Sequence, residues 1–530
     1  MKPYDMGVLF DDCADHGVPT TVLLDRPFDI APGAGLTYDM PALAGLVREA
    51  SGWLAAAGAG PGDRVAIVKR NHWDYDLLAC AAIRLGAVPA QLSAHLAAEA
   101  LQELVKRLDS ALLVTDAALL RRCRDEGVDL PSLASRVLSL DSAEEGALTL
   151  ADVRGTTPPA PRRPVRDEPL VINHTSGTTG VPKLVVHSTG TIIGKLAGLE
   201  ANRLPVVGVR RDDTLVNASS YAHGRTFCWT ASVCCLAPRR IVVLTGADPA
   251  TADPVLRSAP PTVVEALPAT FVRFTPLLSR LDNPFRDVRL YISTYDAVHP
   301  PVVRGYLAAS AVRRPLWMQG WGQTETGPIT FRFLTRGSVA SRGDRHPTTR
   351  NLGRPVPVRT RLKVVDPETF RPVARGEAGL VLVRTPARCL GYLGEERRWA
   401  AKQDGKWWNT GDLARRGRDG SVVLLDREVD SVPELSCLET EDLLEDRLPG
   451  VLECIVLGTT DGPPLPVLVT ESPLPQHEWV TATSDLPRLR EPVVVRWEDV
   501  PRTGTGKVRR LALLRALTGQ SAPTGTGRWT

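Results

Sequence analysis

Hydrophobic positions in the N-terminal half of the chain follow two alternating patterns, helical spacing and short continuous runs. Helical spacing covers residues 40–57, 75–85 and 101–108, and apolar runs occupy 63–68, 87–90 and 111–114. Helices that alternate with buried strands are typical of a parallel, doubly wound sheet. Further apolar runs at 170–172, 240–244, 262–266 and 290–292 repeat the pattern and predict a second α/β subdomain.

The pattern changes after residue 355. Apolar runs at 358–365, 379–384 and 421–425 are separated by turns, which predicts an antiparallel β unit with no helix between its strands. An acidic helical stretch at 438–447 and apolar runs at 453–457 and 493–497 then predict a small α+β domain.

These patterns predict an α/β protein with a large N-terminal domain and a small C-terminal α+β domain. The expected bounds are 1–425 for the N-terminal domain, about 355–425 for its β unit, 431–520 for the C-terminal domain and 521–530 for a disordered tail.

Composition narrows the function classes. The 530 residues are 43 % hydrophobic and 23 % charged, which is a globular balance, and a net charge of +4 over this length does not favour nucleic-acid binding. No apolar run reaches the roughly 18 residues of a membrane-spanning helix, and no signal peptide precedes the first helix, so we expect a cytoplasmic protein without a membrane partner. The nine cysteines form no CxxC pair and are expected to be buried thiols rather than zinc ligands or disulfides.

Lysine is rare in this chain. Nine of the 64 basic residues are lysines, and the others are arginines. Each lysine therefore stands where arginine is the usual basic residue, which makes its position informative.

A Thr-, Ser- and Gly-rich loop follows the apolar run 170–172. Residues 175–180 carry small or hydroxylic side chains, so backbone N–H groups and hydroxyls can converge on phosphate oxygens. Lys183 adds a point charge for the same oxygens. The spacing differs from the GxxxxGK[ST] loop, because no Ser or Thr follows the lysine.

Three further motifs suit nucleotide chemistry less specifically. In the segment 319–327, Glu325 can hold Mg²⁺ and Trp321 can stack on a base. In 408–413, Asp412 follows an expected tight turn and can accept the hydroxyls of a ribose. In 501–509, Lys507 lies on a Gly-rich loop that is suited to carry a mobile cation.

In this order, the four motifs resemble those of the adenylate-forming superfamily, which includes acyl- and aryl-CoA ligases, adenylation domains of peptide synthetases and luciferases. The resemblance covers about residues 35–515, with weaker matches at 220–224, at 376–379 and at Asp426–Arg427. It implies a large N-terminal domain of two doubly wound subdomains and a β unit, and a small, mobile C-terminal domain. A hinge at 426–430 is likewise implied by the resemblance.

The resemblance also implies roles for individual residues, with ATP as co-substrate and Mg²⁺ as cofactor. Thr175, Ser176, Gly177, Thr178, Thr179, Gly180 and Lys183 would hold the β- and γ-phosphates, Thr324 the α-phosphate, Glu325 the Mg²⁺, Asp412 and Arg427 the ribose, and Trp321 the base. Lys507 would reach the reacting oxygens during adenylation, where negative charge develops.

The expected substrate pocket departs from the family pattern. His223 stands where peptide-synthetase domains place an aspartate for an α-ammonium group, which favours a free carboxylic acid over an α-amino acid. Tyr295 and Asp296 replace glycines that line the acyl group, with Gly320 expected opposite them. Either they shorten the pocket and favour a polar, amine-bearing substrate, or their side chains point away.

The expected acceptor loop also departs. Residues 431–436 contain Pro433 and Glu434 in place of the Lys- and Gly-containing loop that shapes the pantetheine tunnel. The main hypothesis is an AMP-forming ligase that adenylates a small aromatic or polar acid and transfers it to CoA or a carrier thiol. The alternatives are an adenylating enzyme with another acceptor, such as a diazotase that activates nitrite for an aryl amine, and a non-catalytic adenylate-binding homologue.

Overall fold

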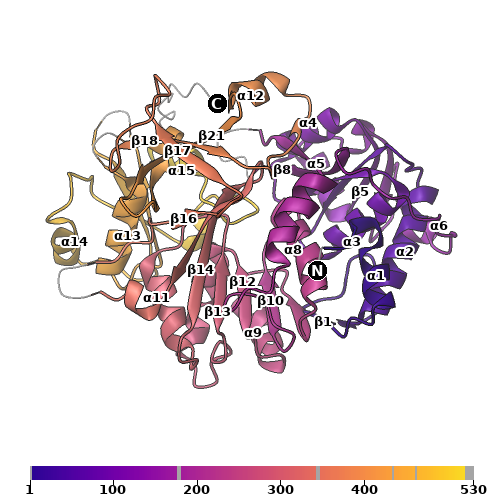
Figure 1. Ribbon diagram of the computed structural model, residues 1–530, viewed down its shortest axis with the longest axis horizontal. Coiled ribbons are helices and arrows are strands. Elements are labelled where there is room, and N and C mark those ends of the chain that lie inside the picture. Colours follow the sequence, from indigo (N-terminus) through magenta and orange to yellow (C-terminus); the bar gives the residue numbers. More distant parts are fainter. Residues whose placement is uncertain (1–2, 176–180, 342–345, 433–434, 460–461, 520–530) are drawn as a thin grey trace. The chain divides into compact units, whose positions relative to one another are not determined.

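The computed structural model describes residues 3–175, 181–341, 346–432, 435–459 and 462–519 (Figure 1). Two compact units are present, and each is considered by itself. The first comprises Met1–Glu265, Thr324–Gly327 and Pro386–Glu396, and the second comprises Ala266–Gln323, Pro328–Thr385 and Arg397–Thr530. Within the described residues, no helix is long and apolar enough to span a membrane.

The first unit contains an eight-stranded sheet in the order β19-β9-β8-β4-β3-β5-β6-β7. Its strands are β3 (Arg64–Lys69), β4 (Val88–Ser93), β5 (Ser110–Thr115), β6 (Ala134–Ser139), β7 (Leu148–Thr149), β8 (Pro169–His174), β9 (Leu184–Ser188) and β19 (Gly391–Tyr392). The pairs from β8 to β7 are parallel, as predicted, whereas β9 runs antiparallel to β8. The reversal follows from the connection, because β8 and β9 are joined by a short loop rather than a crossover helix.

The helices predicted at 40–57, 75–85 and 101–108 are confirmed as α2 (Met40–Ala56), α3 (Asp74–Leu85) and α4 (Ala98–Leu108). α5 (Ala117–Asp125) and the short α6 (Leu150–Val153) continue the alternation. α2 packs against α3 and against α1 (Leu9–Asp15), so these helices lie side by side in Figure 1.

The first unit also contains strands in the order β12-β10-β11-β1-β2, with bounds β1 (Thr21–Leu24), β2 (Thr37–Tyr38), β10 (Thr214–Ala218), β11 (Arg240–Val243) and β12 (Val263–Ala266). α8 (Gly224–Leu236), α9 (Pro249–Ser258) and the short α7 (Gly198–Glu200) accompany them. α8 contacts both α1 and α3, and all of its residues from Thr226 to Leu236 are buried. A helix buried on all sides has no polar stripe, which explains why periodicity did not predict it.

Asn71 fixes the loop after β3 to the ends of two other strands. Its amide Nδ2 donates to the carbonyl oxygens of Ser219 (3.1 Å) and Thr245 (3.0 Å), and its Oδ1 accepts from the Tyr221 N–H at 2.8 Å. Lys69, at the end of β3, is fully buried and its Nζ lies 2.6 Å from carboxylate oxygens of both Asp29 and Asp74. These contacts hold the segment that leads into His223.

The second unit begins with strands in the order β16-β15-β14-β13, with bounds β13 (Leu290–Ser293), β14 (Leu316–Gln323), β15 (Gly327–Leu334) and β16 (Arg354–Pro355). Two helices, α10 (Pro268–Phe274) and α11 (Pro300–Ala309), accompany this sheet. β13 and β14 are parallel, so Ser293 pairs with Gln319 and the segments that follow both strands emerge at one edge.

The predicted antiparallel β unit is present. It contains β17 (Arg361–Val365), β18 (Ala378–Arg384), β20 (Gln403–Asp404), β21 (Trp407–Arg416) and β22 (Val422–Arg427). The prediction that no helix interrupts this region was wrong, since α12 spans Glu396–Ala401 and its residues have high helix propensity. The expected tight turn at 408–413 was also wrong, because these residues lie within β21.

The C-terminal elements are α13 (Cys437–Arg447), β23 (Glu453–Leu457), β24 (Leu465–Val469), α14 (Gln476–Thr483), β25 (Val493–Val495) and α15 (Arg510–Thr518). Alternate residues of β23 face opposite cores: Cys454 and Val456 pack with α13 and α14, whereas Ile455 and Leu457 pack with α15. The mixed α+β character is as predicted, while the exact bounds of the hinge and the C-terminal domain stay predictions. The tail at 521–530 lies outside the described residues.

Candidate active site

Thr175 and Lys183 close the base of the predicted phosphate loop in the first unit. The Thr175 N–H donates to the Lys183 carbonyl oxygen at 3.0 Å, and the Lys183 N–H donates to Thr175 Oγ1, also at 3.0 Å. β8 and β9 therefore deliver both ends of the loop to one point. Ser176, Gly177, Thr178, Thr179 and Gly180 lie outside the described residues.

Glu325 and Lys183 meet at the same tyrosine. The Tyr392 hydroxyl donates to Glu325 Oε1 at 2.5 Å, and Lys183 Nζ lies 5.7 Å from the centroid of the Tyr392 ring. The Cys389 N–H donates to the Glu325 carbonyl oxygen at 2.8 Å and fixes the backbone there. Tyr392 thus contacts both the Glu325 carboxylate and the Lys183 ammonium group.

A carboxylate such as Glu325 fits Mg²⁺, which prefers oxygen ligands and is commonly held by one or two carboxylates together with phosphates. The side chain is 7 % exposed, and one of its two oxygens has the Tyr392 hydroxyl as a donor. No cluster of three or more His, Cys, Asp or Glu residues suited to a metal occurs within the described part of the chain. Glu325 therefore fits a metal that takes its other ligands from phosphate and water.

Thr324 is oriented through its backbone by a buried histidine. His187 Nε2 donates to the Thr324 carbonyl oxygen at 2.8 Å, and His187 Nδ1 lies 3.0 Å from Thr191 Oγ1. Burial lowers the pKa of His187, so the ring is neutral and keeps its Nε2–H for this carbonyl.

His223 lies beside the start of the phosphate loop. It precedes α8 as its N-cap residue, is 6 % exposed, and its Nδ1 lies 2.9 Å from Ser220 Oγ. Its ring centroid is 4.5 Å from that of His174, the residue before Thr175. Burial lowers the pKa of His174 to about 4, and its Nε2 accepts from the Ser93 N–H. Two buried imidazole rings thus meet in the first unit.

Asp412 lies on β21 in the second unit and is 7 % exposed. Gln323, at the end of β14, donates from Nε2 to the Thr410 carbonyl oxygen (2.6 Å) and to Asp412 Oδ2 (3.3 Å). Trp321 also hydrogen bonds to the Asp412 side chain. β21 is irregular on both sides of Asp412, since Gly411 has a φ of +75° and the register with β22 shifts between Leu413 and Ala414.

Lys507 and Arg427 stand near the Asp412 carboxylate. Burial raises the pKa of Asp412, while the charges of Arg427, Lys402 and Lys507 oppose that rise. Burial likewise lowers the pKa of Lys507; the carboxylates of Asp296 and Asp412 favour its charged form, and Arg427 disfavours it. The second unit therefore brings together four predicted residues, Asp296, Asp412, Arg427 and Lys507.

The segment after β13 carries the two predicted departures from the family pattern. Tyr295 has a φ of +79°, which is an unusual conformation for a residue with a large side chain. Asp296 follows it and is exposed, with its Oδ1 accepting from the Ala297 N–H. Gly320 packs between Phe331 and Thr294, and a Cβ there would lie 3.3 Å from each of them. A larger residue at position 320 would therefore need small shifts of the Phe331 and Thr294 side chains.

Sequence reasoning missed four residues of these sites: Tyr392, His187, Gln323 and Lys402. Tyr392 and His187 follow no motif and act through contacts that only the tertiary structure creates. Gln323 lies inside the recognised 319–327 motif, in which Gly320, Trp321, Thr324 and Glu325 were the residues given roles. Lys402 lies close to Asp412, because its Nζ is 3.2 Å from the position that a Cβ on Gly411 would take. The rarity of lysine in this chain is the signal that could have drawn attention to it.

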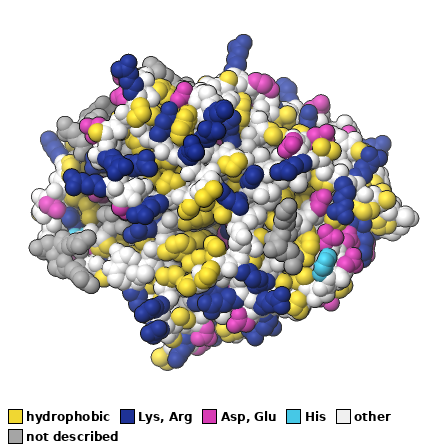
Figure 2. Space-filling view, in the orientation of Figure 1, with side chains coloured by type: hydrophobic (Ala, Val, Ile, Leu, Met, Phe, Trp, Pro, Cys, Tyr) yellow, Lys and Arg dark blue, Asp and Glu magenta, His cyan; other side chains and the backbone are white. Residues whose placement is uncertain are grey.

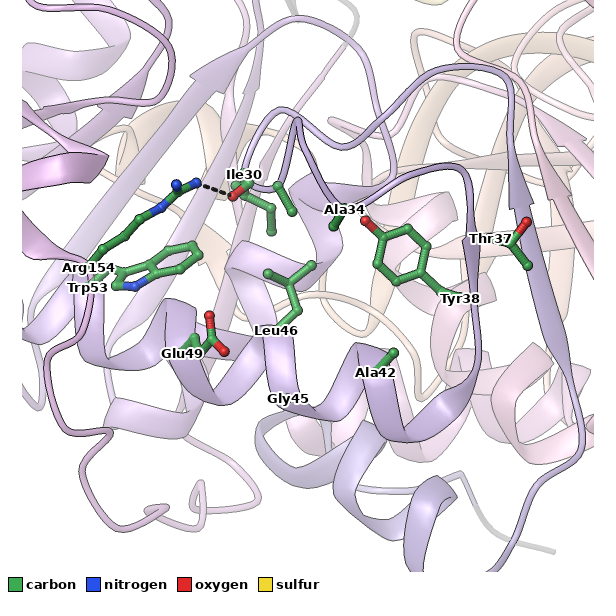
Figure 3. Close-up of a pocket in the computed structure, with 11 residues that line it drawn as sticks. Ile30, Ala34, Thr37, Tyr38, Ala42, Gly45, Leu46, Glu49, Trp53 and Arg154 are labelled. Carbon is green, nitrogen blue, oxygen red and sulfur yellow. Dashed lines mark hydrogen bonds between the residues drawn. The ribbon is translucent and has the colours of Figure 1, made fainter.

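A separate surface pocket of about 590 Å³ lies in the first unit between the segment 30–38 and α2 (Figure 3). Leu46 and Trp53 of α2 line it, and Arg154 Nη2 donates to the Ile30 carbonyl oxygen at 3.4 Å. None of the predicted site residues lines this pocket. Lys and Arg side chains are spread over the face of the molecule seen in Figure 2, with Asp and Glu among them.

Comparisons with known proteins agree with the motifs. The model of the family described as AMP-binding enzyme matches residues 20–393. The chain is 36 % identical to a protein of Streptomyces cremeus named 3-amino-2-hydroxy-4-methoxybenzoate diazotase, covering 98 % of this chain and 96 % of the relative. It is 27 % identical to a 3-aminoavenalumate diazotase of a Streptomyces species, covering 78 % and 72 %.

A solved structure shares the fold. A benzoate CoA ligase from Burkholderia xenovorans LB400 superposes with a TM-score of 0.78 and 18 % identity, over 96 % of this chain and 99 % of the other. The predicted α/β fold, with a large N-terminal domain and a small C-terminal domain, is thereby confirmed.

Replacing Asp412 by alanine is expected to weaken ATP binding by about 1–3 kcal/mol, because ribose hydroxyls would lose a charged acceptor. Calorimetric titration with ATP measures the change. The exposed Asp419 lies on the turn after β21, so Asp419→Ala serves as the matched control and should bind ATP normally. Equal affinity in wild type and Asp412→Ala would remove Asp412 from the nucleotide site.

Replacing Lys507 by alanine is expected to slow adenylation by about 10²–10³-fold, because a cation aimed at developing charge would be lost. ATP affinity should stay near the wild-type value, since the expected role of this lysine lies in the reaction step. Pyrophosphate release and ATP titration separate the two effects. Lys406→Ala changes an exposed lysine of the same unit and is the control; full activity in Lys507→Ala would contradict the assigned role.

Proposed function

Because the chain belongs to the AMP-binding enzyme family, and is therefore an ATP-dependent, AMP-forming adenylating ligase, we propose that it is a diazotase. In this proposal ATP activates nitrite, and the activated nitrite then converts an aryl amine into a diazonium ion. The substrate class is an aminobenzoate that carries a hydroxyl group. The observation that carries the proposal is the likeness to a named diazotase over almost the whole of both chains.

Asp296 supports an amine-bearing substrate. It replaces a small residue of the family pattern with an exposed carboxylate, and its charge acts on Lys507 in the same unit. A carboxylate at this place can hold an aryl amine and accept the proton that the amine must lose. An apolar acyl chain bound at this place would cover the Asp296 carboxylate without pairing it. Burying an unpaired carboxylate is unfavourable, so this residue disfavours such a substrate.

The first step forms a P–O bond and breaks another. A nitrite oxygen attacks the α-phosphorus of ATP, pyrophosphate leaves, and AMP–O–N=O results. Negative charge grows on the phosphate oxygens as the leaving group departs, so the proposed role of Lys507 is to stabilise that charge. Lys183 and Thr175 would hold the departing phosphates, and Mg²⁺ on Glu325 would supply further neutralisation of phosphate charge.

The second step transfers the nitrosyl group. The amine nitrogen attacks the nitrosyl nitrogen, the N–O bond to AMP breaks, and the amine loses one proton, which we assign to Asp296. The resulting ArNH–N=O takes up a proton and loses water to give ArN₂⁺. One nitrite oxygen therefore ends in AMP and the other in water, and no oxidant or reductant is required.

The proposal needs no thiol acceptor. The expected acceptor loop at 431–436 lacks the Lys- and Gly-containing pattern that shapes a pantetheine tunnel, although Pro433 and Glu434 themselves lie outside the described residues. CoA or a carrier thiol is the acceptor in the competing hypothesis of an acid–thiol ligase.

The proposed location of the enzyme is the cytoplasm.

Isotope transfer tests the reaction. The enzyme is incubated with ATP, Mg²⁺, ¹⁸O-labelled nitrite and 3-amino-2-hydroxy-4-methoxybenzoate, without CoA, and AMP is analysed by mass spectrometry. The expected result is one ¹⁸O atom in AMP and trapping of the diazonium ion by an electron-rich arene. A parallel reaction with ¹⁸O in the substrate carboxylate should leave AMP unlabelled.

The same experiment can contradict the proposal in a defined way. Label from the carboxylate in AMP, together with AMP formation that saturates with CoA, would restore the acid–thiol ligase. AMP formation that depends on neither nitrite nor an amine would also exclude a diazotase.

Replacing Asp296 by asparagine is expected to raise the KM for the aryl amine about 10-fold or more, because a charged hydrogen-bond acceptor is lost. The KM for ATP should change little. Asp287 is exposed at the opposite end of β13, so Asp287→Asn is the matched control. An unchanged KM for the amine in Asp296→Asn would remove this residue from substrate recognition.

A further inference from the structure

Asp442 of α13 is fully buried and receives hydrogen bonds from three residues of an earlier segment of the second unit. His299 Nδ1 lies 2.7 Å from Oδ1, while the Thr349 N–H and Arg350 Nε lie 2.8 and 2.9 Å from Oδ2. His299 is the N-cap residue of α11, and Thr349 and Arg350 precede β16. The contact therefore joins α13 to the segment 299–350.

Two neighbouring acids on α13 extend the contact. Asp446 lies 2.7 Å from Arg304 Nη2 and 2.5 Å from His346 Nδ1, and Glu445 lies 3.6 Å from His299 Nε2. Residues 442, 445 and 446 occupy one face of the helix, because they are three and four positions apart. We call this set, Asp442, Glu445 and Asp446, the acidic face of α13.

Asp442 carries the negative charge that faces His299 and Arg350, whereas burial raises the pKa of Glu445 to about 8 and favours its neutral form at pH 7. Burial lowers the pKa of His299, but the carboxylates of Glu445 and Asp442 outweigh that and raise it to about 9. Burial would raise the pKa of Asp442, yet Arg350 and His299 hold it below its usual value. His299 and Arg350 thus present positive charge to Asp442 at neutral pH.

The residue next to Asp442 leads to the Lys507 loop. Glu441 accepts from Arg510 at 2.7 and 3.0 Å, and its Oε1 also accepts from the Val456 N–H of β23 at 2.7 Å. Arg510 begins α15, three residues after Lys507. Within the loop, the Thr503 N–H donates to the Lys507 carbonyl oxygen at 2.8 Å and the Lys507 N–H donates to Thr503 Oγ1 at 3.2 Å.

The other side of the contact leads to Asp412. Gln319 Nε2 donates to the Thr349 carbonyl oxygen at 2.8 Å. Gln319 lies on β14, whose last residue, Gln323, donates to Asp412. Glu441 and Asp442 are adjacent on α13. Glu441 contacts the start of α15, next to the Lys507 loop, and Asp442 contacts the segment that is hydrogen bonded to β14, the strand whose Gln323 contacts Asp412.

We propose that the acidic face of α13, bound to His299, Arg304, His346 and Arg350, is a positioning device that holds Lys507 beside Asp412 for the adenylation step. The proposal rests on the role of Lys507 proposed above. The contact is polar and buried, so moving α13 away from His299 and Arg350 would leave buried charges unpaired. Other placements of α13 are therefore disfavoured. The C-terminal elements should therefore stay in the arrangement described here through both steps of the reaction.

The test compares Asp442→Asn with Glu439→Gln, which removes the same charge from an exposed position of the same helix. Pyrophosphate release should fall about 10-fold in kcat for Asp442→Asn, with the KM for ATP unchanged. In a Lys507→Ala background, Asp442→Asn should cause no further loss, because a positioning residue acts only through the group that it positions. Glu439→Gln should leave kcat unchanged relative to its parent in both the wild-type and the Lys507→Ala backgrounds.

A second readout does not depend on turnover. Acetic anhydride labels lysine amines, and mass spectrometry resolves the individual lysines of this lysine-poor chain. Lys507 should react about 10-fold faster in Asp442→Asn than in wild type, with the exposed Lys406 as internal reference. If Asp442→Asn does not fold, Asp446→Asn and His299→Gln carry the same test, and melting temperatures verify folding.

The outcomes are distinguishable from a failure of the proposed function. Unchanged Lys507 labelling in folded variants overturns the positioning role, whatever the substrate proves to be. An equal loss of kcat on the Lys507→Ala background also overturns it, since the effect would then be general. Failure of nitrite incorporation alone would contradict the diazotase and leave the labelling result standing.

Discussion

The candidate site in the second unit depends on buried side chains of opposite charge that keep one another ionised. In the second unit, the charges of Arg427, Lys402 and Lys507 act on Asp412, and both Asp412 and Lys507 are desolvated by burial. Burial pushes the pKa values of Asp412 and Lys507 toward their neutral forms, and the neighbouring charges push them back. Such a balance suits a site for a highly charged nucleotide. The ionised forms of Asp412 and Lys507 are then available to interact with the ribose hydroxyls and the phosphates.

The first unit meets the same constraint with different residues. Lys69, Asp29 and Asp74 form a buried ionic group at the end of β3, and Asn71 then ties that end to Ser219 and Thr245. The cost of desolvating these groups is offset by short, well-aligned contacts. Asn71 also accepts from the Tyr221 N–H, so the same end of β3 is fixed to the segment that leads into His223.

Much of the fold and site could be predicted from the sequence, because the relevant information is local. Alternating helices and strands indicated the doubly wound sheets. Lys183, Glu325, Asp412 and Lys507 lie in four short motifs whose order along the chain, rather than any one motif, resembles the adenylate-forming superfamily. The roles assigned to them remain predictions. α8 could not be predicted, because a fully buried helix has no amphipathic period. Residues 408–413 were taken for a turn because Gly411 and Asp412 suit turns, whereas the positive φ of Gly411 occurs inside a bulged strand.

Residues that act through tertiary contacts left no trace in the sequence. Tyr392, His187 and Asp442 have no neighbouring motif, and each forms its contact with a partner far along the chain: Glu325, Thr324 and His299 respectively. The acidic pattern of α13 was recognised, but an acidic helix is usually a solvated one. Only the structure shows that Asp442 and Glu445 are buried against cations.

The burial of the cysteines affects how readily the enzyme's own thiols can be nitrosated. All nine cysteines lie in the described part of the chain, and all are buried as free thiols. Burial raises the pKa values of Cys80, Cys228, Cys389 and Cys454, so these sulfurs are neutral as well as inaccessible. Thiolates are the form that reacts with electrophiles. If AMP–O–N=O is the intermediate, a nitrosyl group that escapes the amine meets no exposed thiol on the protein that made it, and the catalyst is protected from S-nitrosation by its own packing.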